Sequence, residues 1–202
     1  MKKTLIAIAL ASTGFLALPA LAQAQNNSGF FINGNIGQSS LDKGVYDDND
    51  TGWAANFGYR WAVAPSALIG IEGGYADLGK FGTRNMYTGL PFGNASIKGW
   101  NLGVNGHFNL TDNWYLSGRG GYFRPDVRGS YISSVTTDAA GNPVYGITTV
   151  DSSANKWYVG AGFGYDFSNN FSIGLNYDYY KANTSGLNFN PSLVSVSGEY
   201  RF

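Results

Sequence analysis

The sequence predicts an all-β chain that forms an eight-stranded antiparallel transmembrane up-and-down β-barrel. Segments in which apolar and polar residues alternate recur along the chain, and this period is that of a strand with two different faces. Glycine accounts for 29 of 202 residues, aromatic residues for 16 % and charged residues for only 13 %, which disfavours long helices and favours pleated strands. Short turns and long polar loops alternate between the segments, as in outer-membrane barrels.

Residues 1–22 have the features of a cleaved secretory signal peptide. Lys2 and Lys3 form a basic start, residues 5–18 an apolar run, and Ala20-Leu21-Ala22 a cleavage pattern of small residues. The apolar run is shorter than the about 20 residues that a transmembrane helix needs. Cleavage after Ala24 is the alternative. We therefore expect an exported chain in which residues 23–202 form one outer-membrane β-barrel domain, with no second domain after it.

The composition also argues against several classes of function and structure. Lysine and arginine number 13, as do aspartate and glutamate, so no charge excess favours binding to nucleic acid. The chain contains no cysteine, so we expect neither disulfides nor a thiolate site, and stability must come from backbone pairing and packing. After the signal peptide no apolar stretch approaches about 18 residues, so a membrane crossing must use strands.

The first four expected strands cover residues 30–41, 53–63, 69–75 and 100–110. Each has bulky apolar residues on one face and small or polar residues on the other. The second strand is the clearest, because its aromatic residues alternate with Asn56, Gly58 and Arg60. The apolar faces carry Phe30, Ile32, Ile36, Trp53, Phe57, Tyr59, Trp61, Ile69, Ile71, Tyr75, Trp100, Leu102, Val104 and Phe108.

The last four expected strands cover residues 115–123, 156–167, 171–180 and 192–202. Their apolar faces carry Leu116, Tyr122, Trp157, Val159, Phe163, Tyr165, Ile173, Leu175, Tyr177, Val194, Val196, Tyr200 and Phe202. We expect residues 192–202 to pair with residues 30–41, because an open sheet edge does not persist in hydrocarbon. Tyr200 and Phe202 lie at the end of this closing strand, and we interpret them as an aromatic assembly signal.

The connections between these strands alternate in length. Short turns are expected at residues 64–66, 111–113 and 168–170, and long loops near 42–52, 79–95, 125–153 and 182–191. Long loops on one side are the external loops of outer-membrane barrels. A soluble barrel would show the same alternation with its apolar face inward. However, eight strands enclose too little space for all of these aromatic residues, so we expect the apolar face to contact lipid.

The opposite face then lines the lumen and carries charges of both signs. These inward charged residues are Arg60, Glu72, Arg119, Lys156, Asp166, Asp178, Glu199 and Arg201. An isolated charge in a narrow interior is costly, so such groups must be paired or hydrated. We expect an interior polar network that plugs the lumen. The alternative is a narrow channel for ions or small solutes, which requires this network to rearrange.

Other motifs give weaker indications of chemistry. His107 is the only histidine and faces inward, and we interpret it as a lining residue because no convincing nucleophile accompanies it. The glycine-rich segment 160–164 lacks the strand-to-helix context of a phosphate loop. The acidic segment 47–50 lacks the spacing of a calcium loop. We therefore expect no enzymatic activity, no cofactor, no metal and no catalytic residue; an outer-membrane lipid-modifying enzyme is the less favoured alternative.

Several segments together resemble the OmpA-like family of outer-membrane β-barrels. They are Gly29-Phe-Phe-Ile-Asn-Gly-Asn-Ile-Gly37, Phe57-Gly-Tyr-Arg60, Ile71-Glu-Gly-Gly-Tyr-Ala-Asp-Leu-Gly79 and Gly198-Glu-Tyr-Arg-Phe202. The resemblance covers the mature chain and implies an eight-stranded barrel inserted by the outer-membrane assembly machinery. The size is nearer to small barrels of the OmpX and Ail kind, which implies roles in envelope integrity and adhesion. The peptidoglycan-binding domain of full-length OmpA proteins is missing, so cell-wall anchoring is not implied.

We thus expect a monomeric integral protein of the Gram-negative cell outer membrane, with a structural and surface-interaction role. Its expected partners are outer-membrane lipids and lipopolysaccharide, the assembly machinery, and a host or surface ligand that binds the external loops. Arg124 and Arg128 are candidates for contact with lipopolysaccharide phosphates.

Overall fold

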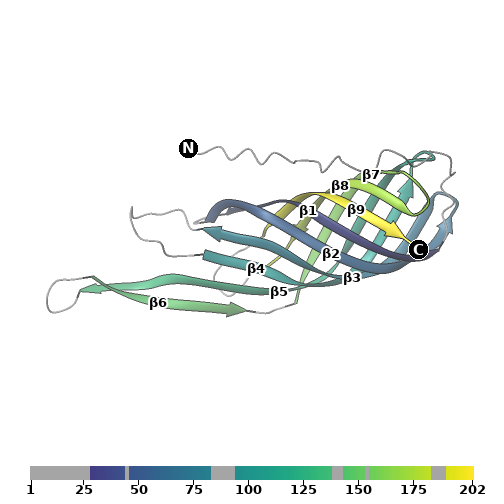
Figure 1. Ribbon diagram of the computed structural model, residues 1–202. Coiled ribbons are helices and arrows are strands. Elements are labelled where there is room, and N and C mark those ends of the chain that lie inside the picture. Colours follow the sequence, from purple (N-terminus) through teal and green to yellow (C-terminus); the bar gives the residue numbers. More distant parts are fainter. Residues whose placement is uncertain (1–27, 44–45, 83–93, 138–142, 153–154, 183–189) are drawn as a thin grey trace.

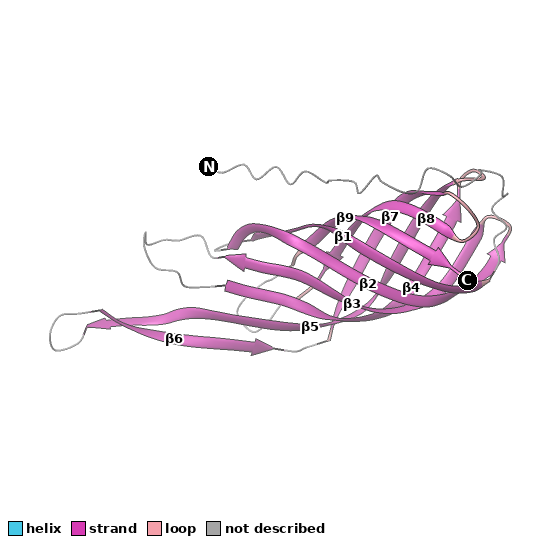
Figure 2. Cartoon of the chain, in the orientation of Figure 1, coloured by secondary structure: helices cyan, strands magenta, loops and turns pink. Residues whose placement is uncertain are grey.

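The computed structural model describes residues 28–43, 46–82, 94–137, 143–152, 155–182 and 190–202. This part of the chain is built from strands (Figures 1 and 2). The strands are β1 (Gly29–Lys43), β2 (Tyr46–Ala64), β3 (Ala67–Gly82), β4 (Asn94–Asn109), β5 (Trp114–Thr137), β6 (Pro143–Ser152), β7 (Lys156–Asp166), β8 (Phe171–Tyr180) and β9 (Ser192–Arg201). Within the described residues, no helix is long and apolar enough to cross a membrane.

Eight of these strands form a closed antiparallel barrel. The pairing follows the order β4-β3-β2-β1-β9-β8-β7-β5, and the additional pairing of β4 with β5 closes the circle. The first strand pairs with the last over ten residues of each, from Phe31 with Arg201 to Ser40 with Ser192. The prediction of an eight-stranded antiparallel barrel closed by its first and last strands is therefore confirmed.

The ninth strand, β6, lies outside this circle. It pairs with the outer part of β5, from Val127 opposite Ser152 to Thr137 opposite Pro143. Figure 1 shows this ribbon extending past the ends of the other strands. The prediction of one long loop over residues 125–153 is wrong, because the serines and threonines that suggested a loop are interleaved with β-branched residues that favour strands.

Two of the other long connections are also shorter than predicted, whereas the connection near 182–191 lies between the end of β8 at Tyr180 and the start of β9 at Ser192, as predicted. Strands β1 and β2 are paired as far as Lys43 and Tyr46, so strand residues occupy much of the expected loop 42–52. Strand β3 continues to Gly82 and β4 begins at Asn94, which shortens the expected loop 79–95. The barrel wall consequently reaches well beyond the segments with bulky apolar faces.

The short turns lie at the opposite end, as predicted. The backbone N–H of Leu110 donates to the carbonyl oxygen of Trp114 at 2.7 Å, and that of Phe167 donates to Phe171 at 2.9 Å. The Thr111 hydroxyl also accepts from the N–H of Trp114 at 3.0 Å. We call this the short-turn end of the barrel and the other the long-loop end.

Large apolar side chains cover the outside of the barrel along the segments that alternate. Phe57 is 66 % exposed, Trp100 65 % and Tyr122 72 %, although aromatic residues in a water-soluble protein bury most of their surface. Their neighbours in the sequence point into the lumen, where Asn56, Asn101 and Phe123 are buried. The predicted orientation, with the apolar face outward, is therefore confirmed.

Candidate functional site

Seven of the eight predicted inward charges project into the lumen of the barrel. They are Arg60, Glu72, Arg119, Asp166, Asp178, Glu199 and Arg201, and we call this set the charged network. Lys156, the eighth residue, lies at the long-loop end of β7, level with Phe123 on β5. It makes no ion pair with a member of the charged network.

The centre of the network is an ion pair between Arg60 on β2 and Glu199 on β9. The guanidinium donates to both carboxylate oxygens, with Nη1 2.5 Å from Oε1 and Nη2 3.0 Å from Oε2. Its Nε donates to Oδ1 of Asn105 at 2.5 Å, and the guanidinium lies 4.1 Å from the centre of the Phe31 ring. Two parallel N–H···O bonds fix both side chains in position, as in other bidentate arginine–carboxylate pairs.

Glu72 accepts hydrogen bonds from neutral donors instead. The hydroxyl of Tyr158 donates to Oε1 at 2.7 Å, and Nδ2 of Asn105 donates to Oε2 at 3.1 Å. Asn105 therefore connects Glu72 to Arg60. A buried carboxylate satisfied at both oxygens is held in one position.

A second cluster lies at the short-turn end, around Asp166. Its Oδ1 accepts from Nη2 of Arg201 at 2.9 Å and from the hydroxyl of Ser172 at 2.5 Å, and its Oδ2 lies 3.1 Å from Nε2 of His107. The ring of Tyr115 stacks on that of His107, with 4.1 Å between centres. Arg201 also lies 3.3 Å from Glu199, measured from Nε to Oε1, and so joins the two clusters.

These contacts make a continuous chain through the lumen. In order from the short-turn end, its members are Ser172, Asp166, Arg201, Glu199, Arg60, Asn105, Glu72 and Tyr158. The ion pair of Arg119 with Asp178 lies beside it, where Nε donates to Oδ1 at 2.6 Å and Nη2 donates to Oδ2. The charged residues were predicted from the sequence to face inward. Asn105, Tyr158 and Ser172 were not predicted as links between them, and neither were the pairs that they form.

Glycines allow these pairs to form between strands that are not neighbours. Gly160 on β7 lies in register between Arg119 on β5 and Asp178 on β8. A Cβ atom there would lie 1.9 Å from Oδ1 of Asp178. Gly70 on β3 has the same place between Arg60 and Asn105. Because the middle strand has no side chain at this position, the flanking side chains meet on its lumen side.

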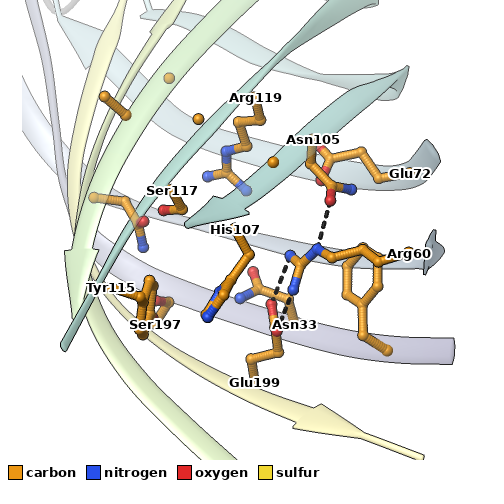
Figure 3. A pocket seen from close by; sticks show the side chains of 16 residues that line it. Asn33, Arg60, Glu72, Asn105, His107, Tyr115, Ser117, Arg119, Ser197 and Glu199 are labelled. Atoms are coloured by element: carbon orange, nitrogen blue, oxygen red, sulfur yellow. Dashed lines mark hydrogen bonds and ion pairs between the residues drawn. The ribbon is translucent and has the colours of Figure 1, made fainter. Parts of the chain in front are cut away.

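The remaining space in the network is small. Figure 3 shows Arg60, Glu72, His107, Arg119 and Glu199 around a common space. Its volume is about 30 Å³, which holds roughly two water molecules at 10–15 Å³ each. The space is thus of a size for trapped water and not for a solute.

Above the network, toward the long-loop end, the lumen is filled by apolar side chains that the sequence reading had not recognised. They form one cluster, which we call the apolar plug: Leu41, Ala54, Ala76, Leu78, Phe81, Ile97, Phe123, Val127, Tyr158, Tyr180, Ala182 and Leu193. All are at most 2 % exposed. Except for Phe81, which follows the irregularity in strand pairing between Asp77 and Lys80, their inward position follows from the same period of two that placed the charges, so the signal was present in the sequence.

The arrangement around His107 does not resemble a catalytic site. The Ser172 hydroxyl donates to Asp166, so its proton is directed away from the imidazole that would have to accept it from a nucleophile. His107 is buried and covered by Tyr115. The glycines of segment 160–164 alternate along β7, and a strand interior is not the strand-to-helix context of a phosphate loop.

Three predictions fall partly or wholly outside the described part of the chain. The signal peptide of residues 1–22 lies outside the described residues, and so do the side chains of Asp47, Asp48 and Arg128. Among the described residues, no group of three or more His, Cys, Asp or Glu side chains could hold a metal ion.

Comparison with known proteins agrees with this fold. The profile of the family described as "Outer membrane protein beta-barrel domain" matches residues 8–202. Among solved structures, Ail, the attachment invasion locus protein of Yersinia pestis, has a TM-score of 0.53 and 14 % identity, with 88 % of this chain and 99 % of that chain covered. Neisserial surface protein A has a TM-score of 0.51 and 9 % identity, with coverage of 87 % and 99 %. At such identities the likeness shows the fold alone. No curated protein matches the sequence significantly.

Proposed function

The chain belongs to the outer membrane protein β-barrel domain family and is an outer-membrane barrel, and from this premise we propose a structural and surface-interaction role without enzymatic activity. The barrel anchors the chain in the membrane, and the long-loop end presents the binding surface to the outside. The observation that carries this proposal is the β5–β6 ribbon beyond the barrel. Residues 1–22 are proposed as the cleaved signal peptide that directs residues 23–202 to this membrane.

The ribbon has the properties of a recognition surface. Strand β5 is last paired with β4 at Gly129, and from Ser130 to Thr137 its described partner is β6. Two-stranded ribbons have backbone N–H and C=O groups free along their edges, which can pair with an extended segment of another protein. Between Gly129 and Val150 the only charged residue is Asp138, and Ser, Thr, Tyr and Gly predominate. Such a composition suits adaptable hydrogen bonding at binding surfaces.

The filled lumen supports this role over that of a channel. Every member of the charged network is ion-paired or hydrogen-bonded, and the space that the network leaves is about 30 Å³. Transport would require the pairs of Arg60 and Arg119 to break, and each is buried, so breaking it is strongly unfavourable.

We propose lipopolysaccharide and the assembly machinery as further partners. Arg124 is exposed and lies on the outer face of β5, one outward residue beyond Tyr122 toward the long-loop end. A guanidinium at this height can bind phosphate at the outer surface of the membrane. Tyr200 and Phe202, whose rings meet edge to face at 5.1 Å, are proposed as the assembly signal.

Shortening the ribbon tests the surface role. In the shortened chain, residues 130–149 are replaced by a two-residue turn. Cells that carry equal amounts of the whole or the shortened chain at their surface are then compared for adherence to protein-coated surfaces. We expect the whole chain to confer adherence and the shortened chain to lose it, while both still migrate differently on a gel with and without boiling. Equal adherence of the two would contradict the role of the ribbon.

A further inference from the structure

Part of the way along the barrel, the polarity of the two faces of each strand reverses, although the same alternate residues continue to point inward. On β4, the inward residues near the short-turn end are His107, Asn105 and Asn101, and the outward residues end with Trp100. Beyond Trp100 toward the long-loop end, Ile97 points inward and is fully buried, while Lys98 points outward. The polar inside and apolar outside of a membrane barrel thus change to an apolar inside and a polar outside.

The reversal occurs at the same level on neighbouring strands. An aromatic girdle marks it, and contacts within the girdle join Trp53 to Tyr75 at 5.9 Å, Tyr75 to Trp100 at 5.1 Å and Trp157 to Tyr179 at 5.5 Å. Its members are Trp53, Tyr75, Trp100, Tyr122, Trp157 and Tyr179. The next outward residues toward the long-loop end are Thr51, Asp77, Lys98, Arg124, Asn155 and Lys181. Aromatic belts lie at the membrane–water interface, so these polar residues mark where lipid ends.

The apolar plug fills the lumen above this girdle. Phe123 and Tyr180 meet at 4.9 Å between ring centres, and the rings of Tyr158 and Tyr180 are stacked at 5.9 Å. Leu193 on β9 and Ile97 on β4 are fully buried in the same cluster. A barrel with a packed apolar interior and a polar exterior is the arrangement of a water-soluble barrel.

We propose that the barrel has two segments, a transmembrane segment and a water-exposed segment that continues it beyond the aromatic girdle. The apolar plug lies in the water-exposed segment and seals the lumen independently of the charged network. This inference rests on the proposed non-conducting role and adds a second barrier to it. The two barriers differ physically. Ion pairs can exchange partners with water, whereas a packed apolar core excludes water and makes the passage of an ion costly.

Bilayer conductance of three purified variants tests the second seal. The network variant combines Arg60→Ala with Glu199→Ala, which removes both charges of the pair. The plug variant combines Phe123→Ser with Tyr180→Ser, and the third carries all four changes. Tyr122→Ser, a lipid-facing neighbour of Phe123, is the matched control. Gel mobility with and without boiling shows that each protein retains its barrel.

We expect no steady conductance from the network variant, the plug variant or the control, and steady conductance when both layers are changed. Conductance of the network variant equal to that of the fourfold variant would overturn the proposal, because the plug would then be no barrier. A folded fourfold variant that stays closed would also overturn it, because a seal would lie elsewhere. Steady conductance of the unaltered protein would instead contradict the proposed non-conducting role, so the two failures are distinguishable.

Discussion

Arg119 on β5 and Asp178 on β8 form a doubly hydrogen-bonded ion pair across the intervening strand β7, at the position where that strand carries Gly160. The same arrangement joins Arg60 to Asn105 across Gly70. A pair between alternate strands ties three strands together, whereas a pair between neighbours ties two. At these two positions, the inward glycine leaves room for the flanking side chains to meet.

This relationship predicts that Gly160→Ala destabilises the barrel. The new Cβ atom would occupy the space of the Asp178 carboxylate, 1.9 Å from its Oδ1, and would push it away from Arg119. Overpacking of this kind costs about 1–3 kcal/mol. We expect the free energy of unfolding, measured by urea titration in detergent micelles, to fall by an amount in that range.

Gly118→Ala is the control for this change. Gly118 lies on the neighbouring strand β5 and faces outward, and no atom lies within 4 Å of the position of an added Cβ. Since alanine restricts the unfolded chain more than glycine does, we expect an unchanged or slightly higher stability. Equal losses from the two substitutions would show that Gly160 has no special role in the pair.

Removal of one partner of the Arg60–Glu199 pair should cost more than removal of both. Arg60→Ala leaves the Glu199 carboxylate buried without its principal partner, and breaking a buried pair in this way costs about 3–5 kcal/mol. Arg60→Met combined with Glu199→Leu removes both charges and keeps most of the volume, so we expect a smaller loss. Urea unfolding of the three proteins measures the difference; a double variant as unstable as the single one would contradict this explanation.

The position of the membrane boundary can be tested by cysteine labelling, since the natural chain has no cysteine. Lys98→Cys lies beyond the aromatic girdle and Leu102→Cys lies within the apolar band. We expect a membrane-impermeant thiol reagent applied to whole cells to label Cys at position 98 and to leave position 102 unlabelled. In the absence of lipid, the side chain of Leu102 is 65 % exposed. Labelling at position 102 would therefore show that this face is in contact with water and not with lipid.

The sequence predicted the barrel because its signals are local. A period of two assigns each side chain to a face, and short polar segments mark the turns. Those two signals were enough for eight strands. The orientation of their faces also required the limited space inside eight strands, and their closure required the cost of an open sheet edge in hydrocarbon. They also placed Arg119 and Asp178 in the lumen.

The pairs and the plug depend on information that a period of two does not contain. Arg119 meets Asp178 because the register of three strands places Gly160 between them, and register arises from the whole barrel. The period of two also places Phe123 and Tyr180 on the inward face, but that face was expected to carry small or polar residues. The change at Trp100 and Lys98, where the polar face becomes the outer one, was the signal in the sequence for a second segment with its own core.

Substitution of Phe202 separates assembly from stability. The side chain of Phe202 is 73 % exposed and its ring touches that of Tyr200, while its backbone N–H donates to the carbonyl oxygen of Phe30 at 3.0 Å. Phe202→Ala keeps this backbone bond and removes a side chain with few contacts. If the side chain acts in assembly, the variant should accumulate less in the outer membrane at native expression, and it should unfold at nearly the urea concentration of the unaltered protein once purified and refolded.

Tyr177→Ala provides the comparison, because Tyr177 on β8 is also lipid-facing, at 52 % exposure, but lies in the middle of the wall. We expect this variant to reach normal amounts in the membrane. If Phe202→Ala is both less stable and less abundant in the membrane, Phe202 acts through the folded barrel, because loss of an assembly signal leaves the stability of the folded state unchanged. Equal amounts of both variants would mean that the machinery does not recognise this aromatic side chain.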